Sequence, residues 1–433
     1  MSASRTTAAS TEPATPGTRC LHRYLIGQLV SNTGTWMQRA AQDLLVLHLT
    51  GNRGSAVGLL TALQFLPQTL FGLTGGIIAD RFPKRRLLLI TQTTMGLQSL
   101  LLGLLTISGT ITTASLCALA VALGTATALD QPARNAFISE LVERDAAPAA
   151  ISLNSAQYNV ARILGPALAG LAVAGAGAGP VFLANAASYL AVLYGLVTIR
   201  AEQLRSSNRS RPQRTRVADA FRHIAATPDL FLPIAVVGFV GTFGLNFQVT
   251  IALVAATVFH TGSVAFGCLS AAFATGGLIG ALLGAALRRP PTSGRLIVAA
   301  VAFGVLEAAV GLAPGYVTFL VLLVPTGLLA VTVTTTANAL TQLSVDPGMR
   351  GRVMSVYFLV LLGGTPLGAP MVGWASDSFG ARYSLILGGL ISAAAPALLA
   401  LVTARTRRIP RPGAPPPIAE ATITEASVRP GRR

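Results

Sequence analysis

The feature that most constrains this chain is a series of apolar runs, each about twenty residues long, that fills most of residues 22–403. A helix needs about 20 such residues to cross the roughly 30 Å apolar core of a bilayer. Lipid offers no hydrogen-bond partners to free backbone groups, so each run is predicted to be helical. The sequence therefore predicts an all-α integral membrane protein rather than a set of soluble domains.

Composition agrees with this interpretation. Hydrophobic residues make up 52% of the chain and charged residues 11%, whereas soluble domains carry roughly 25% charged residues. The formal net charge is +17, but the arginines lie between the apolar runs rather than on one face, so no nucleic-acid partner is expected. Three scattered cysteines and four separated histidines predict neither a disulfide framework nor a metal site, and no cofactor is expected.

Twelve transmembrane helices are predicted. Their approximate ranges are 22–48, 55–79, 87–108, 112–133, 149–175, 179–199, 231–258, 264–287, 295–313, 316–342, 352–375 and 381–403. An even number of spans places both chain ends on the same side of the membrane.

The distribution of basic residues predicts which side that is. With the N-terminus in the cytoplasm, the cytoplasmic segments hold 28 of the 32 Lys and Arg residues, and the opposite loops hold only Arg53 and Arg382. Basic residues concentrate in cytoplasmic loops. We therefore expect a multi-pass protein of the plasma (inner) membrane with both termini in the cytoplasm, where the lipid bilayer is its immediate partner.

The chain divides into two halves with similar features. The predicted domains are a disordered tail (1–20), a six-helix bundle (21–199), a cytoplasmic linker with seven arginines (200–230), a second six-helix bundle (231–403) and a disordered tail (404–433). "RNAFISELV" at 134–142 is echoed by "ANALTQLSV" at 337–345, and Pro166 by Pro366. Repeated six-helix halves are a transporter architecture. Within the linker, "VADAFRHIAA" is predicted to form a short surface helix.

The segment "GGIIADRFPKRRLLL" at 75–89 concentrates charge between two apolar runs, since five of the seven residues 80–86 are charged. It resembles the loop between helices two and three of the major facilitator superfamily, which reads Gly-x-x-x-Asp-Arg-x-Gly-Arg-Arg/Lys. Pro83 stands where that signature has Gly. The resemblance covers about residues 20–405 and implies twelve helices in two pseudo-symmetric six-helix bundles, the major facilitator fold.

This resemblance implies a conformational latch at the cytoplasmic side, with the loop set against helices four and eleven. The predicted latch residues are Gly76, Asp80, Arg81, Lys84 and Arg85 from the loop, and Asp130 and Arg134 from helix four. The alternative is that the basic residues only anchor the topology.

The segments "GQLVSNTGTWMQRAAQDLLVLHLTG" (27–51) and "ALDQPARNAFISELV" (128–142) resemble the branch that contains enterobactin exporters and macrolide efflux proteins. The implied function is a secondary transporter that exports a small organic molecule, such as a drug, an antibiotic or a siderophore, in exchange for protons. An importer and a non-transporting membrane sensor or scaffold are the alternatives. The sole lysine is not in a phosphate-binding loop, so no ATPase is predicted. No other enzyme activity is predicted either. The protein is expected to be a monomer.

A polar stripe runs along the first helix at steps of four and three residues. We expect it to face either a wet substrate cavity or neighbouring helices, because lipid penalises such side chains. The substrate-cavity candidates, from this stripe and from other helices, are Asn32, Trp36, Arg39, Gln42, Gln64, Tyr158, Asn246 and Gln248.

Three charged residues within the spans are candidates for proton coupling. Coupling needs an acid whose proton affinity changes between two states. Asp43 and Glu307 are the two acids, and Arg162 is expected to pair with an acid, with Asp43 as the first choice.

The motif "RILGPALAG" in the fifth helix resembles the antiporter signature of drug exporters, and Gly165, Pro166 and Gly170 are its predicted gate pivot. Proline removes a backbone donor and kinks a helix. Ordinary use of Pro and Gly in membrane helices is the alternative.

Overall fold

The computed structural model describes residues 16–143, 146–199, 217–287, 290–346 and 349–408. The described part of the chain is helical and contains no β-strand, which confirms the predicted all-α class. Its helices are α1 (Pro16–Thr50), α2 (Gly54–Arg81), α3 (Lys84–Ile107), α4 (Thr113–Leu141), α5 (Ala147–Ala176), α6 (Ala178–Thr198), α7 (Val217–Ala226), α8 (Pro228–Phe239), η3 (Val240–Gly244), α9 (Phe247–Leu253), η4 (Val254–Val258), α10 (Ser263–Leu287), α11 (Ser293–Gly311), α12 (Tyr316–Leu343), α13 (Arg350–Phe379) and α14 (Ala381–Arg408).

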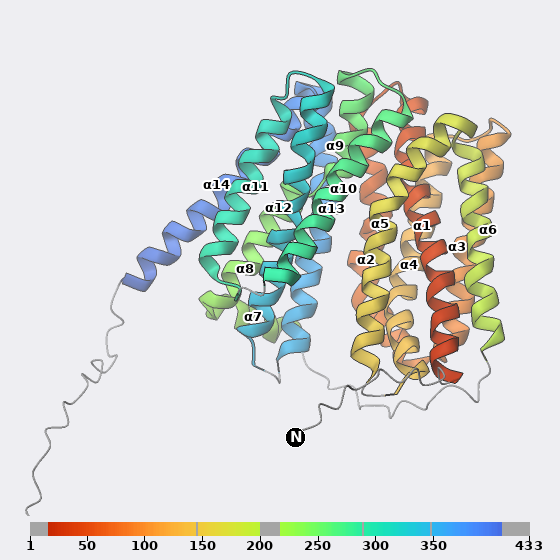
Figure 1. The fold of residues 1–433 in the computed structure, drawn as a ribbon, viewed down its shortest axis with the longest axis horizontal. Helices are drawn as coiled ribbons and strands as arrows, with labels where there is room; N and C mark the ends of the chain where they lie inside the picture. The colour runs from red at the N-terminus through yellow and green to blue at the C-terminus, as the bar shows by residue number, and fades with distance from the viewer. Residues whose placement is uncertain (1–15, 144–145, 200–216, 288–289, 347–348, 409–433) are drawn as a thin grey trace, which may run out of the picture.

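Ten helical segments of this part are long and apolar enough to cross a membrane, by length and composition. Together with α1 and α2, which lie alongside them, they form the bundle in Figure 1. The polar stripe lowers the mean hydropathy of α1 below that of the other spans.

The helices are separated by short turns whose backbone explains their position. Gly51 and Asn52 have positive φ values of 64° and 65° between α1 and α2, and Gly177 has a φ of 81° between α5 and α6. Glycine adopts such values without the steric cost of a Cβ atom. Thr112 begins α4 with a capping box, in which its hydroxyl accepts from the Ser115 backbone N–H.

The seventh predicted span is interrupted, which the sequence did not reveal. The range 231–258 is built from α8, η3, α9 and η4, where η3 and η4 are π-helical and Leu245–Asn246 form a break. Gly244 at the break packs closely against Phe303: a Cβ atom at this position would lie only 2.5 Å from the ring. Such π-segments occur frequently at functional sites.

The chain ends of the two bundles extend beyond the predicted boundaries. α1 begins at Pro16, before the predicted boundary at residue 21, and α14 runs to Arg408. The rest of the two predicted tails lies outside the described residues, and so do residues 200–216 of the linker. The predicted surface helix is present as α7, which lies against α8 and α13.

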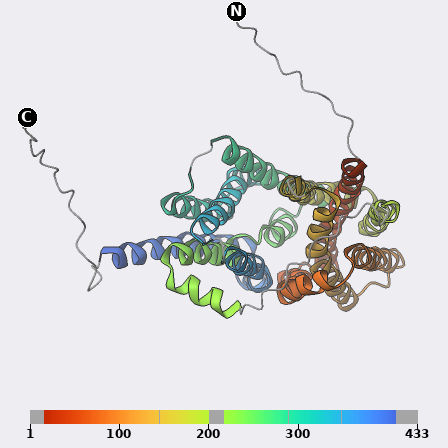
Figure 2. The same cartoon turned by 90° about the horizontal axis from the view of Figure 1, so that it is seen from below.

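The helices form two groups, α1–α6 and α8–α14, which stand side by side in Figures 1 and 2. Two helix pairs make the main contact between them: α2 with α13, and α5 with α10. We call the end of the bundle where α1 begins and α2 meets α3 the inner end, and the opposite one the outer end.

The two groups contact each other most closely near the outer end. A Cβ atom on Gly54 of α2 would lie 2.6 Å from the carbonyl oxygen of Gly373, and one on Gly170 of α5 would lie 2.6 Å from Cα of Gly267. Small residues permit this approach of helix backbones in a membrane. The outer end is therefore closed in this structure.

Candidate functional site

A central cavity of about 440 Å³ lies between the two halves. Helices α1, α2, α4 and α5 line it from one half, and the α9 region, α10, α12 and α13 from the other. Its lining is rich in aromatic and amide side chains. The aromatic residues are Trp36, Phe65, Tyr158, Phe266 and Phe273.

The central cavity continues toward the inner end. A vestibule of about 690 Å³ shares Gln68, Gln131, Tyr158, Asn159 and Leu362 with it. The repeat-related Asn135 of α4 and Asn338 of α12 lie on opposite walls of this vestibule. With the outer end closed, the structure is open toward the inner end.

The predicted cavity residues separate into two groups. Trp36, Tyr158, Asn246 and Gln248 line the central cavity. The rings of Trp36 and Tyr158 meet edge to face with centroids 5.9 Å apart.

The remaining candidates do not line the central cavity; they pack inside the N-terminal half. Asn32 donates to Gln157 of α5 at 3.4 Å, and Gln64 of α2 donates to Gln42 of α1 at 3.2 Å. Arg39 is 2% exposed and lies over the rings of Trp36 and Phe65. The second expectation for the polar stripe, contact with neighbouring helices, describes most of its residues.

One hydrogen bond joins the halves just beyond the outer side of the central cavity. Gln248 Nε2 of α9 donates to Asp43 Oδ2 of α1 at 2.6 Å. Asp43 is fully buried, and its Oδ1 atom has no hydrogen-bond partner within the described structure. One turn earlier on α1, the Nε and Nη1 atoms of Arg39 also lack partners there. A buried acid thus depends on the opposite half for its hydrogen bond.

The other two coupling candidates occupy different surroundings. Glu307 is buried behind the cavity within the C-terminal half, where its carboxyl lies against Gly388 of α14 and Gly244 of η3. Arg162 lines the central cavity and is exposed to it. The expected pairing of Arg162 with Asp43 is not formed in the described structure, since Asp43 accepts from Gln248 instead.

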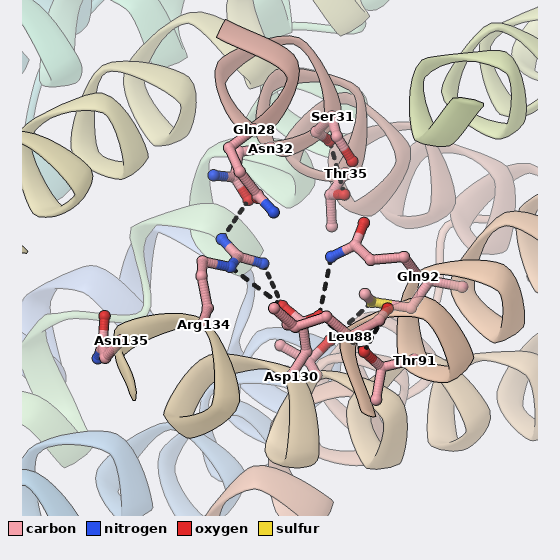
Figure 3. Close-up of polar contacts among 12 residues, drawn as sticks. Gln28, Ser31, Asn32, Thr35, Leu88, Thr91, Gln92, Asp130, Arg134 and Asn135 are labelled. Atoms are coloured by element: carbon pink, nitrogen blue, oxygen red, sulfur yellow. Dashed lines mark hydrogen bonds and ion pairs between the residues drawn. The ribbon is translucent and has the colours of Figure 1, made fainter. Parts of the chain in front are cut away.

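A buried ion pair organises the inner part of the N-terminal half (Figure 3). Asp130 and Arg134, one turn apart on α4, form a salt bridge through Oδ2 of the carboxylate. Thr91 and Gln92 of α3 each donate to Asp130 Oδ1 at 2.8 Å, and Arg134 Nη1 donates to Asn32 Oδ1 of α1 at 3.0 Å. The pair therefore ties α1, α3 and α4 together.

The loop residues predicted to form the latch make contacts of their own. Arg85 donates from Nε to the Leu196 carbonyl at 2.8 Å and from Nη2 to the Val197 carbonyl at 2.9 Å, at the end of α6. Lys84 Nζ lies 3.8 Å from Glu140 Oε1 of α4. Arg81 is exposed. Among the described side chains, this loop does not contact the Asp130–Arg134 pair.

Asp80 and Gly76 are the two remaining predicted latch residues. The side chain of Asp80 lies outside the described residues. Close helix approach falls on Gly75 rather than Gly76, because a Cβ on Gly75 would lie 2.5 Å from the Ala128 carbonyl oxygen whereas one on Gly76 would meet open space.

The predicted gate pivot occupies two helix contacts. Gly165 faces the backbone of Trp36 on α1, since a Cβ atom on Gly165 would lie 2.9 Å from the backbone carbonyl carbon of Trp36. Gly170 faces Gly267 on α10. Pro166, between them, lines the central cavity. The motif thus touches both halves and the cavity.

Asp377, near the end of α13, closes the outer end with a contact that the sequence did not predict. Its Oδ1 accepts from the Gly54 N–H at 2.5 Å and its Oδ2 from the Ser55 N–H at 2.9 Å, at the first turn of α2. The carboxylate serves as an N-terminal cap supplied by the other half, which satisfies two helix donors that lack intrahelical partners.

We expect Asp377→Ala to open the outer end more often. Losing an N-cap costs about 0.5–2 kcal/mol, which corresponds to about a 2- to 30-fold change in the ratio of the two states. The measurement is labelling of Thr61→Cys, a buried cavity position, by an impermeant thiol reagent outside cells, with Cys20, Cys117 and Cys268 replaced by Ala. Labelling no faster than in the Asp219→Ala control would contradict the capping role.

Comparison with known proteins places the chain. The model of a family described as a transmembrane secretion effector, within the major facilitator superfamily, matches residues 15–425. The chain belongs to this family. It is 26% identical over 363 residues to the staphyloferrin A transporter of Staphylococcus aureus, covering 82% of this chain and 89% of that protein. It is 25% identical over 416 residues to the multidrug efflux pump Tap of Mycobacterium tuberculosis, covering 90% and 96%.

Solved structures confirm the major facilitator fold. A bacterial homologue of the human lysosomal transporter Spinster, in an inward-facing and occupied conformation, matches with a TM-score of 0.71 at 16% identity, covering 88% of this chain and 96% of that one. The inward-open xylose transporter XylE of E. coli matches with a TM-score of 0.66 at 13% identity, covering 88% and 95%. The chain is thus a multi-pass membrane transporter of a small molecule and, as a member of this family, not an enzyme.

Several residues that line the cavity are not among those predicted from the sequence. Phe65 and Gln68 of α2, Gln131 of α4 and Asn159 of α5 line the cavity. The polar residues Ser155, Tyr158, Asn159 and Arg162 form a stripe along the fifth helix, like the stripe of the first helix. This pattern is a sequence signal for the cavity wall that α5 provides.

Proposed function

We propose that this transporter exports a small organic molecule, such as a drug, an antibiotic or a siderophore, in exchange for protons, by alternating access of the central cavity. The observation that carries the proposal is the hydrogen bond between Asp43 and Gln248, which joins the halves at the closed end of the cavity. The family description names secretion and one relative is named an efflux pump, which supports export.

The geometry supplies a route for coupling. When the outer end opens, α9 moves away from α1 and Asp43 loses the Gln248 donor. Arg39, one turn away on the same helix, is then its nearest basic group. This exchange of partners changes the surroundings that determine the proton affinity of the carboxyl group. Glu307 lies within one half and keeps its neighbours throughout, so Asp43 is the coupling acid in this proposal.

Transport in cells tests the proposal. Cells that express the protein and cells with an empty vector are loaded with a panel of antibiotics, dyes and siderophores, with and without a proton uncoupler. We expect lower accumulation of at least one compound in the expressing cells and loss of the difference with the uncoupler. Higher accumulation would indicate an importer. An identical profile in both cell types would indicate a sensor or scaffold.

The proposed orientation places the inner end in the cytoplasm. Lys84, Arg85, Arg295 and Arg350 stand at helix starts of that end. Green fluorescent protein fused after Arg408 is expected to fluoresce, and alkaline phosphatase inserted at Ala313, in an outer turn, is expected to be active. Phosphatase activity of a fusion after Arg408 would overturn this orientation.

A further inference from the structure

Among the described residues, the lining of the central cavity carries one charged side chain. Its described lining includes Arg162 and no Asp or Glu. The vestibule lining likewise contains no acid, and its one arginine, Arg134, is already paired with Asp130. Arg162 forms no hydrogen bond or ion pair with any described residue, so its positive charge is uncompensated within the described cavity.

The position of Arg162 places this charge on the transport path. It lies about 20 Å along α5 from the helix start, at 1.5 Å per residue, and so near the middle of the membrane. Ionisable side chains within membrane spans face the bundle interior or a water-filled cavity, and they mark a substrate or ion pathway by default. The described lining residues provide no carboxylate for this guanidinium, which leaves it available to an anionic ligand.

The aromatic side chains around Arg162 indicate what kind of apolar group the ligand carries. Trp36 and Tyr158 meet edge to face on one side, and Phe273, stacked on Phe247 with centroids 4.5 Å apart, lies on the other. Aromatic walls favour a ligand with a flat or bulky apolar body. Guanidinium groups bind carboxylate and phosphate through paired N–H donors.

We propose that the central cavity takes anionic amphiphiles: molecules with an apolar ring system and a carboxylate or related anionic group that binds Arg162. This assignment rests on the proposed function in that it treats the central cavity as the transport site. It narrows the substrate class beyond a small organic molecule, and it makes Arg162 a substrate ligand rather than a partner of Asp43.

Equilibrium binding tests the assignment without transport. The protein contains two tryptophans, of which Trp36 lines the cavity and Trp374 is 61% exposed on the bundle surface. In the Trp374→Phe protein, energy transfer from Trp36 to a dansyl group therefore reports occupancy of the cavity. The probes are dansylglycine, which is anionic, and its neutral methyl ester, added to purified protein in nanodiscs.

We expect dansylglycine to bind about tenfold or more tightly than the ester, because hydrogen bonds between a guanidinium and a carboxylate are roughly twice as strong as neutral ones. Arg162→Gln should remove this preference and Arg162→Lys should retain part of it. Arg86→Gln, which changes an exposed arginine outside the cavity, should leave it intact. Equal binding of both probes, no binding of dansylglycine, or a preference that survives Arg162→Gln would overturn the assignment.

The two proposals fail separately. Charge-selective binding lost in Arg162→Gln, together with no proton-driven efflux, would refute the exchange mechanism and leave the anion site standing. Proton-driven efflux with no charge preference in binding would refute the anion site alone.

Discussion

Asp43→Asn is expected to reduce proton-driven efflux to the level of cells that lack the protein. Asparagine keeps an oxygen that can accept from Gln248, so the closed outer end is retained. It cannot take up or release a proton, so the exchange loses its driving ion. The measurement is uncoupler-sensitive efflux at matched surface expression, with folding checked by the elution profile of the purified variant.

Glu307→Gln is the matched control for this result. Glu307 is also a buried acid within a membrane helix, at 2% exposure, but its neighbours among the described residues, Gly244 and Gly388, belong to its own half. We expect efflux in this variant to remain sensitive to the uncoupler. Loss of coupling in Glu307→Gln with normal coupling in Asp43→Asn would reverse the assignment of the coupling acid.

Asp130→Asn is expected to destabilise the protein by about 3–5 kcal/mol, because it leaves the Arg134 guanidinium buried without a counter-charge. Arg134→Gln should cost less, since Asp130 keeps the Thr91 and Gln92 donors. The measurement is the free energy of unfolding in mixed micelles.

The double variant Asp130→Asn/Arg134→Gln serves as the test of pairing. Removing both charges leaves no isolated buried ion, so it should be more stable than Asp130→Asn alone. Wild-type stability for Asp130→Asn, or a double variant no more stable than that single one, would show that the pair is not an organising contact.

The fold could be predicted from the sequence because its signals are local. Apolar runs about twenty residues long and arginines between them define the spans. The break at Leu245–Asn246 was not predictable from the same signals, since α8, α9 and the π-segments read as one apolar run. Gly244 at the break packs on Phe303, and this contact between helices far apart in the sequence has no local signal.

The candidate site was only partly accessible from sequence for a similar reason. The polar residues of α1 form a visible stripe, but helical periodicity does not say whether a neighbour or a cavity faces it. Gln248 and Asp43 are both recognisable in the sequence as polar residues within spans, yet they are 205 positions apart and their contact exists only in the folded state. The cap that Asp377 gives to α2 likewise depends on how the halves meet.

The most direct test of proton-coupled alternating access is a pair of distance distributions measured as a function of pH. One pair of spin labels goes at the outer end, on Asn52 and Phe379, and the other at the inner end, on Phe82 and Leu343; all four positions are exposed. We predict that the outer distance lengthens and the inner distance shortens in the same fraction of molecules, with one pH midpoint, and that Asp43→Asn removes the response. Distances that do not change with pH, or that lengthen together at both ends, would contradict this mechanism.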